Sequence, residues 1–174
     1  AVISDDESME KKILYSPRLI SKKVFVDPML SMGLPSSIAA STGMDALTHC
    51  IEAYLAKGFS PLCDGIALEG LRLISKSLEM SVIQPTFESR AQMMMVSLMG
   101  ATASQKGLGV VHSMSHALSA VTDMHHGLAN ALMLTHGIEF NVSASEERIE
   151  VVCETIGLKE KSPRALISWL QDLN

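Results

Sequence analysis

The spacing of apolar residues changes at Pro35 and is helical from there to the end of the chain. After this proline, apolar side chains recur every three or four positions, which is the period of one buried helix face. Gly58 and Gly157 close two of these runs, as glycine does at many helix C-termini. The predicted helices run from Ser36 to Gly58, Pro61 to about Lys76, Thr86 to about Gln105, Val110 to about Ala120, Gly127 to Phe140, Ser143 to Gly157, and Pro163 onward.

Before Pro35 the pattern favours extended structure. Residues 1–3 form a short apolar run, and Lys23–Val26 is a β-branched and aromatic run that ends at Asp27-Pro28. Two short strands do not make a stable sheet by themselves. We therefore expect residues 1–30 to be residual strands of an α/β domain outside this chain. Residues 31–174 are expected to form a mainly α, multi-helical domain.

Composition agrees with one globular domain and argues against two classes of partner. Of the 174 residues, 47% are hydrophobic, so the chain can bury a substantial core. The net charge is −5, and no basic run exceeds the pairs Lys11-Lys12 and Lys22-Lys23, so no nucleic-acid partner is expected. No apolar run approaches the ~20 residues that cross a bilayer, so no membrane partner is expected either.

The cysteines bear on the cellular compartment. Cys50, Cys63 and Cys153 are odd in number and far apart, which predicts neither a disulfide framework nor a thiolate zinc site. The first ten residues carry acidic side chains where a secretory signal would carry basic ones. We therefore expect a cytoplasmic protein.

One carboxylate and a group of histidines carry the candidate chemistry. Asp45 and His49 are four residues apart on one predicted helix, and His112 and His116 have the same spacing on another, so each pair shares a helix face. His126 follows a short break and can approach from a third direction. Such ligands suit iron, zinc, cobalt or manganese. A single pair of this kind is common by chance, but one shared metal would compensate several clustered titratable groups.

Other features are weaker candidates. Gly107-Leu-Gly109 follows a predicted helix and lacks the third glycine of a dinucleotide-binding turn, so a helix end and a turn are the favoured interpretation. Glu52 is expected either to support a ligand side chain or to face solvent, and we favour the first. Cys50 is expected to be a small core residue.

Two long segments resemble a known family. The segments DPMLSMGLPSSIAASTGMDALTHCIEAY and HSMSHALSAVTDMHHGLANA are similar to the two signature regions of the iron-containing (group III) alcohol dehydrogenases, and the similarity covers nearly the whole chain. The resemblance implies a proton-relay residue, His116, beside the nicotinamide and the substrate. It implies four metal ligands: Asp45, His49, His112 and His126. It also places Lys11 at the cofactor ribose or phosphate and Leu108 in a segment that lines the substrate pocket.

The same resemblance implies a fold and an activity. The helical part would be a dehydroquinate synthase-like α domain, incomplete at its C-terminus, and the nucleotide-binding domain would be missing. The implied activity is that of a metal-dependent alcohol dehydrogenase, with Fe²⁺ or Zn²⁺ and with NAD or NADP. The implied partners are a small alcohol or aldehyde and further copies of the protein in a homodimer or larger homo-oligomer. This chain alone is expected to be catalytically incomplete.

Two alternatives stay open. One is a zinc-dependent relative such as glycerol dehydrogenase or dehydroquinate synthase. Those relatives generally use three protein ligands, so His49 beside Asp45 favours the iron group. The other is a non-catalytic metal-binding fragment that acts through an exposed apolar surface.

Overall fold

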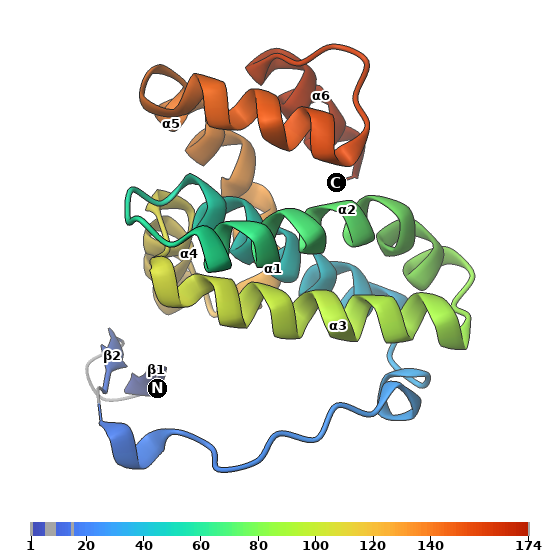
Figure 1. The fold of residues 1–174 in the computed structure, drawn as a ribbon. Helices are drawn as coiled ribbons and strands as arrows, with labels where there is room; N and C mark the ends of the chain where they lie inside the picture. The colour runs from blue at the N-terminus through green and yellow to red at the C-terminus, as the bar shows by residue number, and fades with distance from the viewer. Residues whose placement is uncertain (1, 6–9, 15, 174) are drawn as a thin grey trace.

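Residues 2–5, 10–14 and 16–173 are described by a computed structural model, and this part of the chain is mainly helical (Figure 1). The helices are α1 (Ser36–Leu55), α2 (Pro61–Ile83), α3 (Phe87–Ala103), α4 (Val110–Thr122), α5 (His126–Ile156) and α6 (Pro163–Leu173), with short 3-10 helices η1 (Pro17–Leu19), η2 (Pro28–Ser31) and η3 (Ser104–Lys106). Within the same residues, none of the helices combines the length and the apolar character that crossing a membrane requires.

The N-terminal residues form a small hairpin. Strands β1 (Val2–Asp5) and β2 (Glu10–Ile13) pair in antiparallel fashion, with Val2 opposite Ile13, and β2 lies close to α4. The predicted strand at Lys23–Val26 is wrong, because this segment has no regular structure and Phe25 is 87% exposed. Strand-favouring side chains form a strand only beside a partner that completes the hydrogen bonds. The assignment of residues 1–30 to another domain stays a prediction.

Helix α1 is the central element of the bundle, and it contacts α2, α3 and α5 (Figure 1). Leu47 and Ile51 of α1 are fully buried in one hydrophobic cluster with Leu71 of α2 and Ile138 of α5. Each such side chain contributes roughly 1.5–3 kcal/mol on burial. The cluster therefore holds in place the helix that carries Asp45 and His49.

Most of the predicted helix boundaries are confirmed within a few residues, with one difference. Helix α2 continues to Ile83, beyond the predicted end at about Lys76. Helix α5 consists of two helical parts that meet at a kink, where the backbone of Ser145 is not helical (φ −143°, ψ 21°). The kink lies within Ser143–Glu146, where the second helix was predicted to start, so the predicted division after Gly127 is confirmed. Gly157 ends α5 with a φ of 84°, as predicted.

A close contact sets the position of the first turn of α5. A Cβ atom on Gly127 would lie 2.2 Å from the carbonyl oxygen of Ser41 in α1. Any larger side chain at this position would push the two helices apart. Because His126 directly precedes Gly127, the contact also fixes the distance between His126 and the residues of α1.

Candidate metal centre

Side chains from α1, α4 and α5 meet around the carboxylate of Asp45. Its Oδ1 atom lies 3.5 Å from Nδ1 of His49, 3.8 Å from Nε2 of His112 and 3.5 Å from Nε2 of His126. Asp45, His49 and His112 each offer one ligand atom, and these atoms all lie within 4.8 Å of one another. These three residues can therefore reach a single ion, and His126 borders them from α5.

His116 lies at the edge of this group. Its ring centroid is 5.1 Å from that of His126 and 6.2 Å from that of His112, and its side chain is half-buried. The structure thus brings His116 beside the candidate ligands but outside the set of atoms that converge on Asp45. This location agrees with a division between ligands and a separate histidine, while the relay role stays a prediction.

Glu52 fixes the orientation of the His112 ring. Its Oε2 atom accepts a hydrogen bond from Nδ1 of His112 at 2.6 Å, and its Oε1 atom accepts one from the backbone N–H of Val111 at 2.7 Å. Gly109 permits this approach, because a Cβ atom there would lie 2.6 Å from Oε1. Since Nδ1 donates, Nε2 keeps its lone pair for a metal, as in many metal-binding histidines. Glu52 is only 4% exposed, so the solvent-facing alternative is wrong.

His49 is oriented by its own helix. Its Nδ1 atom lies 3.0 Å from the backbone carbonyl oxygen of Asp45, one turn earlier in α1. A carbonyl oxygen can only accept, so Nδ1 carries a proton and Nε2 is the nitrogen that can bind a cation when the ring is neutral. In both histidines of the closest set, a hydrogen bond therefore engages Nδ1 and leaves Nε2 for a cation.

The pKa values of the acidic residues indicate two carboxylates that are ionised at neutral pH. Burial acts to raise the pKa of Asp45, but the hydrogen bond and charge of His49 outweigh it and lower that pKa. Burial likewise acts to raise the pKa of Glu52, but the hydrogen bond from His112 lowers it. For His49, burial acts to lower the pKa and the carboxylate of Asp45 raises it. The site is therefore suited to positive charge.

Asn130 of α5 is a member of this cluster that the sequence analysis missed. Its Nδ2 atom lies 2.5 Å from Oδ1 of Asp45, 3.1 Å from Nε2 of His126 and 3.4 Å from Nε2 of His112. An amide has only two N–H protons, so it cannot satisfy three acceptors. Its own Oδ1 atom is buried without a hydrogen-bond partner. The available signal was its position four residues after His126, on the same helix face.

The predictions for Leu108 and Lys11 have different outcomes. Leu108 is 41% exposed and lines a separate cavity of about 330 Å³, of which Glu52 forms another part of the wall. Lys11 belongs to β2, but its side chain lies outside the described residues. Gly107 ends η3 with a φ of 139° and Gly109 caps α4, so this segment is the helix end and turn that the sequence predicted.

The chemistry of the donor set fits a divalent transition metal. One carboxylate and several imidazole groups are ligands for iron, zinc, cobalt or manganese. Cys50 of α1 does not supply a thiolate ligand, because it is fully buried and burial raises the pKa of its thiol to about 12. The residues present therefore fit a metal ion with nitrogen and oxygen ligands.

Known proteins are similar to this chain in sequence and in fold. Residues 39–174 match the sequence model described as the Fe-containing alcohol dehydrogenase family, C-terminal. The chain is 36% identical over 158 residues to 1,3-propanediol dehydrogenase of Klebsiella pneumoniae, with 90% of this chain and 41% of the relative covered. It is 42% identical over 149 residues to 4-hydroxybutyrate dehydrogenase of Cupriavidus necator, with 82% and 38% covered.

A solved structure gives the same result. The sulfoacetaldehyde reductase of Bifidobacterium kashiwanohense, solved in complex with NAD⁺, matches with a TM-score of 0.78 at 32% identity. The match covers 84% of this chain and 39% of that chain. The chain thus spans about two fifths of the length of the curated relatives it matches.

Proposed function

Because the chain belongs to the iron-containing alcohol dehydrogenase family, we propose that it is the metal-binding part of an enzyme that transfers hydride between an alcohol or aldehyde and a nicotinamide cofactor. The observation that carries this proposal is the convergence of Asp45, His49 and His112 within 4.8 Å. We assign His126 as the fourth ligand, since its Nε2 atom approaches Asp45 from α5. These assignments use only side chains that the fold brings together from three helices.

Each side chain of the cluster has a separate task in this proposal. A divalent metal bound there would act as a Lewis acid toward the substrate oxygen. Glu52 holds the proton on Nδ1 of His112 and so directs Nε2 inward. His116, half-buried beside His126, moves a proton between the substrate and solvent.

We propose iron as the ion, with zinc as the alternative, and NAD or NADP as the second cofactor. The family description supports iron, and the related reductase solved with NAD⁺ supports a nicotinamide cofactor. Lys11 would contact the cofactor ribose or phosphate, and Leu108 would line the substrate pocket beside a further domain. All three cysteines are free, which agrees with the expected cytoplasm, and a homo-oligomer remains our expectation.

Metal content is the first test of this proposal. The chain is purified without oxygen, and iron and zinc are measured by elemental mass spectrometry. We expect about one ion per chain, and a loss of it in His112→Ala but not in His136→Ala, whose histidine is exposed on α5. A helical, folded chain that takes up no metal from excess Fe²⁺ or Zn²⁺ would contradict the ligand assignment.

The relay role needs a protein that joins this chain to a nucleotide-binding domain. In that protein, NAD-linked oxidation of 1,3-propanediol is followed at several pH values. We expect His116→Ala to lower kcat by about 10²- to 10⁴-fold and to change the pH profile while metal content stays the same. An unchanged rate and profile would rule out proton transfer by His116.

A further inference from the structure

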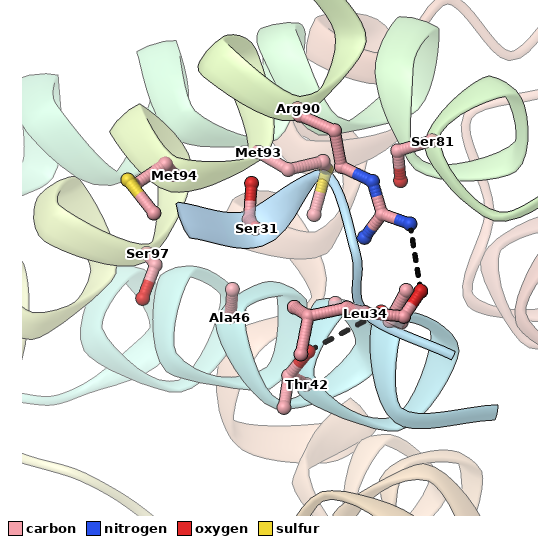
Figure 2. Close-up of a pocket in the computed structure, with 11 residues that line it drawn as sticks. Ser31, Leu34, Thr42, Ala46, Ser81, Arg90, Met93, Met94 and Ser97 are labelled. Carbon is pink, nitrogen blue, oxygen red and sulfur yellow. Dashed lines mark hydrogen bonds between the residues drawn. The ribbon is translucent and has the colours of Figure 1, made fainter. Parts of the chain in front are cut away.

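A second cavity lies between α1, α2 and α3, on residues that take no part in the histidine cluster (Figure 2). It has a volume of about 240 Å³. Leu34, Ala46, Met93 and Met94 give it mostly apolar walls. Figure 2 shows Arg90 and Ser81 toward one end and Met94 and Ser97 toward the other. The cavity therefore combines an apolar body with one cationic group.

Arg90 is buried, and no described residue forms an ion pair with it. The residue is 4% exposed, and among the described residues its guanidinium makes one hydrogen bond, from Nη2 to the carbonyl oxygen of Leu34 at 3.3 Å (Figure 2). Its Nε atom is buried with no hydrogen-bond partner. A buried, uncompensated cation is costly, and a nearby anion removes much of that cost. The cavity beside Arg90 is therefore electrostatically suited to an anion.

The hydrogen bonds of the surrounding hydroxyl groups indicate which class of anion the cavity can bind. Ser31 donates to the carbonyl oxygen of Pro28 at 2.7 Å, and Ser81 donates to that of Leu78 at 2.7 Å. Thr42 likewise donates to the carbonyl oxygen of Ile38 at 2.7 Å. With these protons engaged, Arg90 is the main donor, and one guanidinium matches the two oxygens of a carboxylate. A phosphate or sulfate would call for more donors.

We propose that this cavity binds a short-chain aliphatic carboxylate, with the carboxylate on Arg90 and the hydrocarbon chain against Met93 and Met94. The volume admits a chain of a few carbons and excludes a long fatty acid. Ser97, exposed at the rim, marks the entrance from solvent. The site is independent of the metal centre, so its presence or absence leaves the proposed function untouched.

Binding is tested by titrating the chain with butyrate, with the neutral isostere butyramide, and with inorganic phosphate. Calorimetry gives the affinity, and the methyl signals of ¹³C-labelled Met93 and Met94 report the place of binding. We expect saturable butyrate binding that shifts both signals, with butyramide about 10- to 100-fold weaker because the charge-assisted hydrogen bonds are lost.

Three variants complete the test. Arg90→Met should weaken butyrate binding about 10- to 100-fold, whereas Arg72→Met removes an exposed arginine of α2 and should leave it unchanged. Ser97→Trp should block the entrance. Because this substitution leaves the buried guanidinium in place, it tests the site even if Arg90→Met fails to fold. The proposal is wrong if butyrate binding does not saturate or if butyramide binds equally well. It is also wrong if phosphate binds more tightly than butyrate, or if Ser97→Trp binds butyrate as well as the unchanged chain does.

Discussion

Two polar clusters lie on α1, and they differ in how donors and acceptors are matched. At the C-terminal end of α1, Lys106 and Arg148 both donate to the carbonyl oxygen of Tyr54, at 2.9 and 2.6 Å. Both also pair with Asp64, at 2.5 and 2.9 Å. Around Asp45, by contrast, one amide group from Asn130 faces three acceptor atoms.

The difference separates a structural tie from a binding site. A buried polar network in which each acceptor has a donor needs no additional group. Where buried acceptors outnumber the donors, an added cation stabilises them. The Tyr54 cluster therefore serves the stability of the fold. The Asp45 cluster is suited to an added cation, and substitutions in the two clusters should affect different measurements.

The largest expected effect comes from Asp45→Asn, which keeps the side-chain size and removes the charge. We expect affinity for Zn²⁺ or Co²⁺ to fall by about a hundredfold or more, because a ligand and its charge are both lost. The metal-free chain should keep its stability within about 1 kcal/mol. Calorimetric titration and thermal unfolding measure the two quantities. Normal metal binding by the Asp45→Asn chain would contradict the assignment of the Asp45 cluster as the binding site.

Glu52→Gln should have the next largest effect on metal binding. The amide is a weaker partner for Nδ1 of His112, and changes to residues that orient a ligand commonly cost 10- to 100-fold, so we expect about that loss of affinity. Glu69→Gln, on the exposed face of α2, is the matched control and should change nothing. A stability loss without any loss of affinity would mean that Glu52 only caps α4.

Asp64→Asn should give the opposite result to Asp45→Asn. Metal affinity should be kept, while the free energy of unfolding at neutral pH should fall by about 1–2 kcal/mol, a modest figure because Asp64 is partly exposed. Lys106, whose side chain is only 1% exposed, would lose its charged partner and keep the carbonyl oxygen of Tyr54. Lost metal affinity in Asp64→Asn would show that the two clusters are not independent.

The ion pairs of Asp64 also predict that the free energy of unfolding depends on pH. Partial burial acts to raise the pKa of Asp64, but Lys106 and Arg148 lower it below its usual value of 3.8. The stabilisation is therefore complete above the unfolded-state pKa and disappears as the pH falls through the lower folded-state pKa. Unfolding of the native chain and of Asp64→Asn should differ equally from pH 7 to about pH 5 and converge in strong acid.

The smallest effect is expected from Asn130→Ala. The amide and a metal compete for the same lone pairs, so the metal-free chain should lose about 1 kcal/mol of stability while metal affinity is retained or increased. Asn141→Ala is the control, because Asn141 bonds the carbonyl oxygen of Gly137 elsewhere on α5. A large loss of affinity in Asn130→Ala would instead mean that its amide holds the ligands in place.

The sequence predicted the helices well because apolar spacing reports which face is buried. It failed at Lys23–Val26, where strand propensity met no partner strand. At Ser143–Glu146 the capping pattern correctly located the kink at which the second part of α5 begins. The error at Lys23–Val26 could not be avoided from local residues, since strand formation depends on what packs nearby. The family resemblance implied the helical domain, and the family match supports it.

For the candidate site, spacing placed Asp45 with His49 and His112 with His116 on common helix faces. Spacing could not show that α1, α4 and α5 converge, and only the fold brings Asp45 near His112. Asn130 was not predicted because a neutral amide is not an expected metal ligand. Arg90 was not predicted because arginine is usually exposed, and burial is a property of the folded chain.

A bound ion would close the chain into a loop from Asp45 to His126. In the unfolded chain these side chains have no common location, so the ion would bind the folded form almost exclusively. Each gain in occupancy would then appear as resistance to unfolding, and free metal at about a hundred times its Kd would add about 2.7 kcal/mol. The melting temperature of the protein would follow the supply of metal, and a cell short of that metal would hold less of the folded chain.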